Sequence, residues 1–178
     1  MATDWTLSAD NGPSSPISGA GGFASAWLEH VTTTDNGANG INVVEDTAII
    51  TNSAIWNCTN GIRAALDADV TLTGSDIWSC TNGVYLISTS RATVNGCCNI
   101  YNNNYGFYGD SSAVLTAHEN NIYDNSFYGV SWHSSNTADC TENWWGDASG
   151  PGTPPIAPAV ANALYALSDT GAYGCHAL

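Results

Sequence analysis

A glycine followed by an apolar residue recurs along this 178-residue chain at an almost constant interval. The glycines are Gly40, Gly61, Gly83, Gly106 and Gly129, so the successive differences in residue number are 21, 22, 23 and 23. A repeat of this length constrains the fold more than any local pattern, because each unit is too short to bury a core alone and must stack on its neighbours.

Two columns of apolar residues keep the same spacing as the glycines. Around them apolar and polar residues alternate, which is the periodicity of short β-strands. Gly and Asn residues between the strands are expected to supply the positive φ angles of the corners. The two columns are Ile50, Leu72, Val94, Ala117 and Cys140, and Ile55, Ile77, Ile100, Ile122 and Trp144.

These features predict an all-β fold, a right-handed parallel β-helix of about five to six coils with about 22 or 23 residues in each coil. An amphipathic-helix repeat is excluded, because it requires apolar spacings of three and four residues and few glycines. An immunoglobulin-like sandwich is a weaker alternative, since its strands keep no fixed register of this kind. We expect the β-helix over residues 27–152, a cap or connector over residues 1–26, and a tail over residues 153–178 with a short helix at 160–167.

The charge of the chain excludes some classes of partner. Sixteen acidic residues face only two cations, Arg63 and Arg91, for a formal net charge of −14. Such a surface disfavours nucleic acids and anionic lipids, because it has almost no cations to replace their counterions. No apolar run approaches the roughly 18 residues that span a bilayer. We therefore expect neither a nucleic acid partner nor membrane insertion.

The six cysteines and the absence of lysine favour an extracellular or cell-surface location. Cys58 and Cys80 occupy equivalent places in adjacent coils, and stacking about 4.8 Å apart would bring their Cα atoms within disulfide range. A second disulfide, from Cys140 to Cys175, would hold the tail on the last coil. No pairing is predicted for the two cysteines at positions 97 and 98, where one coil gains a residue.

An aromatic column follows the isoleucine column directly, so alternation predicts that it points outward. Such a ladder would suit stacking on sugar rings or burial against a partner. The equally weighted alternative is that the rings stack on one another and stabilise the solenoid without a ligand. The column consists of Trp56, Trp78, Tyr101, Tyr123 and Trp145.

Three motifs in the repeat carry a family resemblance. They are Asn-Ile-Tyr-Asn-Asn at 99–103, Asn-Asn-Ile-Tyr-Asp-Asn at 120–125, and Asn-Trp-Trp-Gly-Asp-Ala-Ser-Gly-Pro at 143–151. Together they resemble the right-handed parallel β-helix proteins of the pectin-lyase-like superfamily, especially the short-repeat surface and periplasmic members. The resemblance implies that the last motif is a final-coil signature, whose aromatic residues cover the end of the cylinder.

Enzymes of that superfamily usually cleave acidic polysaccharides, but the sequence has no counterpart of their catalytic motifs. Arg63 with Asp67 and Asp69 is the only mixed grouping of charges in the repeat, and we interpret it as a solvated outer face.

Other residues with catalytic or metal-binding chemistry are also interpreted as ordinary surface residues. The carboxylates Asp76, Asp110 and Asp124 have Asn, Ser or Gly at the equivalent positions of adjacent coils, which indicates turn residues rather than a catalytic pair. We expect no catalytic residue, no cofactor and no metal site. Metal-ligand spacing is absent among the histidines, which are His30, His118, His133 and His176.

The ends of the solenoid are expected to be contact surfaces. Trp144 and the tail residues Ile156, Val160 and Leu164 offer apolar surface that would either cover the chain's own last coil or contact another subunit. End-to-end contacts between identical subunits produce filaments.

Two hypotheses on function therefore remain. The favoured one is a non-catalytic extracellular structural or adhesive solenoid that self-assembles as a surface or fibre subunit, since the motifs of the enzymes are missing. The alternative is a carbohydrate-binding module, or a polysaccharide lyase or hydrolase of the pectin-lyase-like type.

Overall fold

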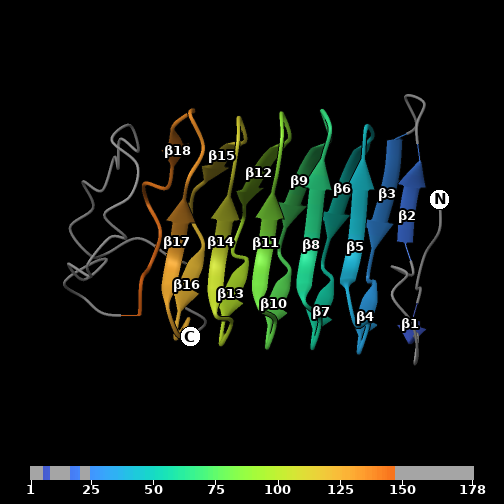
Figure 1. Cartoon of the computed structure of the whole chain (residues 1–178). Coiled ribbons are helices and arrows are strands. Elements are labelled where there is room, and N and C mark those ends of the chain that lie inside the picture. Colours follow the sequence, from blue (N-terminus) through green and yellow to red (C-terminus); the bar gives the residue numbers. More distant parts are fainter. Residues whose placement is uncertain (1–5, 9–16, 21–24, 147–178) are drawn as a thin grey trace.

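The computed structural model describes residues 6–8, 17–20 and 25–146, with side chains from residue 26 onward. All regular elements in these ranges are β-strands, and they form three parallel sheets of six strands each. Figure 1 shows the strands lying across one long axis, with each coil stacked on the one before it. The predicted all-β parallel β-helix is thereby confirmed.

Each coil contributes one strand to each sheet, in the order A, B, C. Sheet A consists of β3 (Ser25–Glu29), β6 (Thr47–Thr51), β9 (Asp69–Thr73), β12 (Arg91–Asn95), β15 (Val114–Ala117) and β18 (Ala138–Asp139). Sheet B consists of β1 (Thr6–Ser8), β4 (Thr32–Thr34), β7 (Ala54–Trp56), β10 (Asp76–Trp78), β13 (Asn99–Tyr101) and β16 (Asn121–Tyr123). Sheet C consists of β2 (Ile17–Ala20), β5 (Asn39–Val44), β8 (Asn60–Ala65), β11 (Asn82–Leu86), β14 (Tyr105–Gly109) and β17 (Tyr128–Trp132).

The two apolar columns form the core, as predicted. In sheet B the isoleucines of β7, β10, β13 and β16 pair in register from coil to coil. Ile50, Leu72, Val94 and Ala117 pair in the same way in sheet A. Every one of these side chains is at most 1% exposed, so the columns form a continuous apolar interior.

The corner between β12 and β13 absorbs the extra residue that the sequence places near positions 97 and 98. Before this corner Val94 pairs with Leu72, and after it Ile100 pairs with Ile77. The second pair is one position further apart in the sequence than the first. The additional residue therefore lies in the corner, and the strands on both sides keep their registers.

The repeated glycines have a different role from the one expected. Positive φ angles occur at Gly74, Gly96 and Gly146, and at non-glycine corner residues such as Asn57, but not at the glycines of the repeat. A Cβ atom on Gly83 would lie 2.6 Å from the carbonyl oxygen of the glycine in the next coil. These glycines are therefore required by the close approach of stacked backbones.

The solenoid begins earlier than predicted. The strands β1 and β2 lie before residue 27, and they pair with β4 and β5 in sheets B and C. The expected boundary after residue 26 is therefore placed too late, because these strands already form a rung. The expected tail at 153–178, with its short helix, lies outside the described residues.

The last coil corrects the assignment of two tryptophans. Trp144 forms a parallel bridge with Asn121, so Trp145 takes the place opposite Ile122. Trp145 packs against the core, whereas the ring of Trp144 lies 5.5 Å from the ring of Tyr123. The reason is that the repeat leading into this coil is one residue longer than the repeat length on which the prediction was based, as the pairing of Leu115 with Ala138 shows.

Candidate functional site

A buried ladder of polar side chains lies in the corner between sheets B and C. Asn36, Asn103 and Asn125 follow the inward residues of sheet B by three positions, and Cys58 and Cys80 take this place in the two coils between them. The Asn103 side chain accepts a hydrogen bond from the Cys80 backbone N–H at 2.9 Å and donates to a carbonyl at 3.2 Å. The ladder therefore holds each corner to the next, and two of its rungs are thiols.

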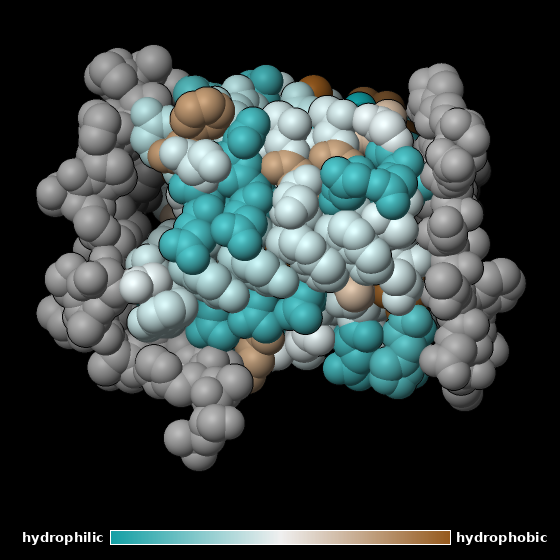
Figure 2. Space-filling model, turned by 90° about the horizontal axis from the view of Figure 1, so that it is seen from below, coloured by the Kyte–Doolittle hydropathy of each residue, from teal (hydrophilic) through white to brown (hydrophobic). Residues whose placement is uncertain are grey.

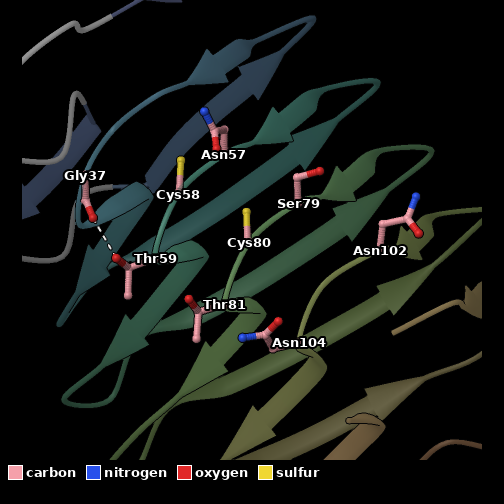
Figure 3. Close-up of a pocket in the computed structure, with 9 residues that line it drawn as sticks. All are labelled: Gly37, Asn57, Cys58, Thr59, Ser79, Cys80, Thr81, Asn102 and Asn104. Carbon is pink, nitrogen blue, oxygen red and sulfur yellow. Dashed lines mark hydrogen bonds between the residues drawn. The ribbon is translucent and has the colours of Figure 1, made fainter. Parts of the chain in front are cut away.

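These two thiols lie in the wall of a polar groove. The groove has a volume of about 560 Å³ and lies over the corners of four consecutive coils. Figure 3 shows both sulfur atoms pointing to the same side of the ribbon, with hydroxyl and amide groups around them. Its lining consists of Gly37, Asn57, Cys58, Thr59, Ser79, Cys80, Thr81, Asn102 and Asn104.

The predicted disulfides are corrected by the structure, in which Cys58, Cys80 and Cys140 are free cysteines. Cys58 and Cys80 do lie in adjacent coils as expected, but their side chains take parallel orientations. Each sulfur lies within hydrogen-bonding distance of the carbonyl two residues before it, at 3.2 Å for Cys58 and 3.4 Å for Cys80. Parallel rotamers keep the sulfurs beyond bonding distance, because proximity of Cα atoms alone does not form the bond. The predicted partner of Cys140, Cys175, lies outside the described residues.

The four free thiols differ in acidity. A hydrogen bond from the Cys80 thiol lowers the pKa of Cys58 to about 7, against an opposing effect of burial. The same interaction, together with burial, raises the pKa of Cys80. Burial raises the pKa of Cys98 to about 11 and that of Cys140 to about 12. Cys58 is therefore the most readily ionised thiol of the four.

The outward aromatic column stacks on itself. The rings of Trp56 and Trp78 are 4.7 Å apart and nearly parallel, and Trp78 and Tyr101 are 5.8 Å apart. Tyr101 and Tyr123 continue the stack at 5.1 Å with an interplanar angle of 3°. Trp145, predicted as the fifth member, packs against the core instead.

Stacking determines which part of each ring faces solvent. Neighbouring rings cover the flat faces along the ladder, so it is mainly ring edges that remain exposed. Figure 2 shows the molecule from the side of sheet B. Residues of intermediate hydropathy cover the middle of this face, and the hydrophobic patches on it are small and separate. Because sugars stack on ring faces, this geometry favours a structural role for the ladder over sugar binding.

A second aromatic cluster, which the sequence did not predict, lies on sheet C. Its rings meet at large angles, such as 73° between Tyr85 and Tyr108 and 79° between Tyr105 and Tyr108. Phe127, which is 59% exposed, contacts Tyr105. The sequence contained a pattern that could have predicted part of this cluster. One residue two positions after each repeated glycine forms a column that pairs in register, and its members include Arg63, Tyr85 and Tyr108. The cluster consists of Tyr85, Tyr105, Tyr108, Phe127, Tyr128 and His133.

A family profile described as a right-handed β-helix region matches residues 19–144. The chain belongs to the right-handed β-helix family. No curated protein and no solved structure is found to match it. The β-helix family establishes the handedness of the coils and the repeat architecture, and it includes both enzymes and proteins without catalytic activity.

Several charged residues of this β-helix contact polar neighbours in other coils. Arg63 donates from Nη1 to the Asn42 side chain at 3.0 Å. Asp76 accepts a hydrogen bond from Asn99 at 2.6 Å. Asp67 and Asp69, which the sequence grouped with Arg63, lie in the next corner and at the start of β9.

His118, which follows β15, has polar partners in the last coil. It lies 3.1 Å from a carboxylate oxygen of Asp139, and its ring also contacts the Thr141 hydroxyl at 3.2 Å. Within residues 25–146 and the two short strands before them, no group of three His, Cys, Asp or Glu residues could hold a metal ion. In the same part of the chain, no helix is long and apolar enough to cross a membrane.

Proposed function

We propose that this β-helix is a non-catalytic structural or adhesive module of the extracellular space or cell surface, of the short-repeat pectin-lyase-like type. The observation that supports it is that outward side chains bond to their counterparts in the adjacent coils. One amide ladder crosses sheet C and another crosses sheet B. The first joins Asn39, Asn60 and Asn82 at 2.8 Å per step, and the second joins Asp76, Asn99 and Asn121 at 2.6 and 2.7 Å.

These ladders use the side chains that a ligand would otherwise engage. An amide that donates to one coil and accepts from the next has used half of its hydrogen-bonding capacity and is fixed in orientation, and the stacked rings of sheet B cover one another. The outer surface is thus organised to hold coils together. Such an arrangement suits a stiff spacer.

The charge of the chain also supports a role outside acidic-polysaccharide cleavage. A net charge of −14 repels polyanionic substrates and slows their approach. We therefore expect no release of unsaturated products from pectate, with or without calcium. Arg63→Ala is the control variant, since pectate cleavage by the wild type that Arg63→Ala abolishes would contradict the proposal.

Self-association through the ends completes the proposed role. Strand edges at the last coil can be paired by another subunit or covered by the chain itself. Sedimentation and electron microscopy of the full chain, and of a chain truncated after Gly152, test this. Filaments that become folded monomers on truncation support a fibre subunit. A full chain that is monomeric at all concentrations, with a truncated chain that aggregates, would leave a free-standing capped module.

A sugar-binding module is the second candidate, and the cluster on sheet C favours it. Tyr85 and Tyr105 both meet Tyr108 edge to face, a geometry that covers less of the ring faces than stacking does, and Arg63 pairs in register with Tyr85 at the border of the cluster. Titration calorimetry with neutral oligosaccharides tests this candidate. Binding that Tyr108→Ala weakens several-fold and Tyr123→Ala leaves unchanged would support it, and absence of binding would eliminate it.

A further inference from the structure

The groove between sheets B and C brings two reactive groups together. Cys58 and Cys80 are consecutive rungs of the corner ladder, and the Thr81 backbone N–H donates to the Cys58 carbonyl at 3.2 Å. This hydrogen bond keeps the two corners at the spacing of adjacent strands, about 4.8 Å. That spacing is within the range of roughly 4.4 to 6.8 Å between Cα atoms of a disulfide. Closure then requires both side chains to rotate toward each other and the two corners to approach slightly, because the Cβ atoms of a disulfide lie about 3.5–4.5 Å apart.

The two thiols are also reachable and unequal. Both line the groove, where Cys58 is 6% and Cys80 is 4% exposed, whereas Cys98 has no exposed surface. The side-chain interaction with Cys80 lowers the pKa of Cys58 to about 7, whereas the same interaction and burial raise the pKa of Cys80. A nucleophilic thiolate beside a protonated thiol is the arrangement that thiol–disulfide exchange requires.

We propose that Cys58 and Cys80 form a redox-active dithiol, which closes to a disulfide between adjacent coils by exchange with a small hydrophilic disulfide that enters the groove. The Cys58 thiolate attacks one sulfur of the small disulfide, whose S–S bond breaks and releases one small thiolate. The Cys80 thiol then loses its proton, and its sulfur attacks that of Cys58 and expels the second small thiolate. Two protein thiols are oxidised, and the small disulfide is reduced to two thiols that take up the two protons.

The charge around the groove selects the type of disulfide. Asp35 acts on Cys58 electrostatically, and its carboxylate accepts a hydrogen bond from the Asn57 side chain at the groove wall. Together with the net charge of −14, this repels anionic disulfides and attracts cationic ones. The rate should therefore decrease from cystamine to 2-hydroxyethyl disulfide to glutathione disulfide, and added salt should reduce the differences.

The position of the two arginines makes the product easy to identify. Trypsin cleaves after Arg63 and Arg91, so Cys58 is the only cysteine in residues 1–63 and Cys80 is the only one in residues 64–91. The other four cysteines are all in residues 92–178. A link between the first two peptides therefore reports this disulfide alone.

The experiment exposes the reduced full chain to each small disulfide, alkylates it before denaturation, and digests it with trypsin for mass spectrometry. In the wild type, residues 1–63 should become linked to residues 64–91, and this pair of peptides should lose the mass of two hydrogen atoms. Cys80→Ser keeps a hydroxyl donor beside Cys58 and should stop at a mixed disulfide on Cys58. Cys58→Asn, which restores the residue found at other rungs of the ladder, should react at least fivefold more slowly.

Circular dichroism confirms beforehand that both variants keep the strand spectrum. The proposal is wrong if the wild type accumulates a mixed disulfide without closing, because the sulfurs then do not meet. It is equally wrong if Cys80→Ser stays unmodified, or if the first peptide links to residues 92–178. A faster reaction with glutathione disulfide than with cystamine would contradict the electrostatic selection.

Discussion

Removal of one amide from the corner ladder should destabilise the whole solenoid. Asn103 is fully buried, and its side chain accepts from the Cys80 backbone N–H and donates to the Ile77 carbonyl and to Asn125. In Asn103→Ala the alanine offers neither an acceptor nor a donor. The Cys80 N–H is then buried without a partner, and the Ile77 carbonyl loses one donor.

The expected loss follows from these two groups. A buried donor without an acceptor costs about 1–3 kcal/mol, and one lost hydrogen bond contributes about 0.5–1.5 kcal/mol. Asn103→Ala should therefore lower the free energy of unfolding by about 2–4 kcal/mol, a large share of the total of about 5–15 kcal/mol for a folded protein. For a chain of this length, the Tm should decrease by at least about 4 °C.

Urea denaturation followed by circular dichroism measures this loss. The matched control is Asn82→Ala, which removes a half-buried amide from the ladder on sheet C and should cost about 1 kcal/mol or less. The midpoint for Asn103→Ala should decrease with an unchanged slope. Equal losses in the two variants would refute the argument, because they would mean that water or a local shift satisfies the buried corner.

Three further predictions concern the stacking of coils. Gly83→Ala should cost about 1–3 kcal/mol, because its Cβ would lie 2.6 Å from the Gly106 carbonyl oxygen; an unchanged Tm would show that the coils can separate. Ile77→Asp should abolish the strand spectrum in circular dichroism, since it places a charge in a fully buried position. Trp78→Ala should remove an exciton band from the stacked pair of Trp56 and Trp78, and a retained band would mean that the rings are not stacked in solution.

Periodicity predicted the core because pairing in register carries each inward residue to the next coil. The columns through Ile77 and Val94 are buried as expected up to Ile122 and Cys140. The same rule was misapplied in the last coil, where the shorter of the two repeat lengths placed Trp144 inward. The longer repeat length, already present between Ala117 and Cys140, would have placed Trp145 there.

The chemistry of the corners was harder to predict. Sequence spacing placed Cys58 beside Cys80, but it contains no information on side-chain rotamers, so it could not distinguish thiols from a disulfide. The role of the glycines depends on the distance between stacked backbones, which spacing along the chain does not report. The column that continues from Arg63 through Tyr85 and Tyr108 was visible at the same period. It was missed because it begins with a charged residue.

The strands lie across the long axis of the solenoid (Figure 1), and this orientation determines how the molecule responds to force. Tension along the axis acts on the hydrogen bonds of every rung in series, and the end coils peel away first because each has a neighbouring coil on one side only. Each released coil, such as the segment from Ile55 to Ile77, adds about 75 Å of extended chain. A bond between Cys58 and Cys80 would keep about one such length from extending, so oxidation would make the solenoid less extensible.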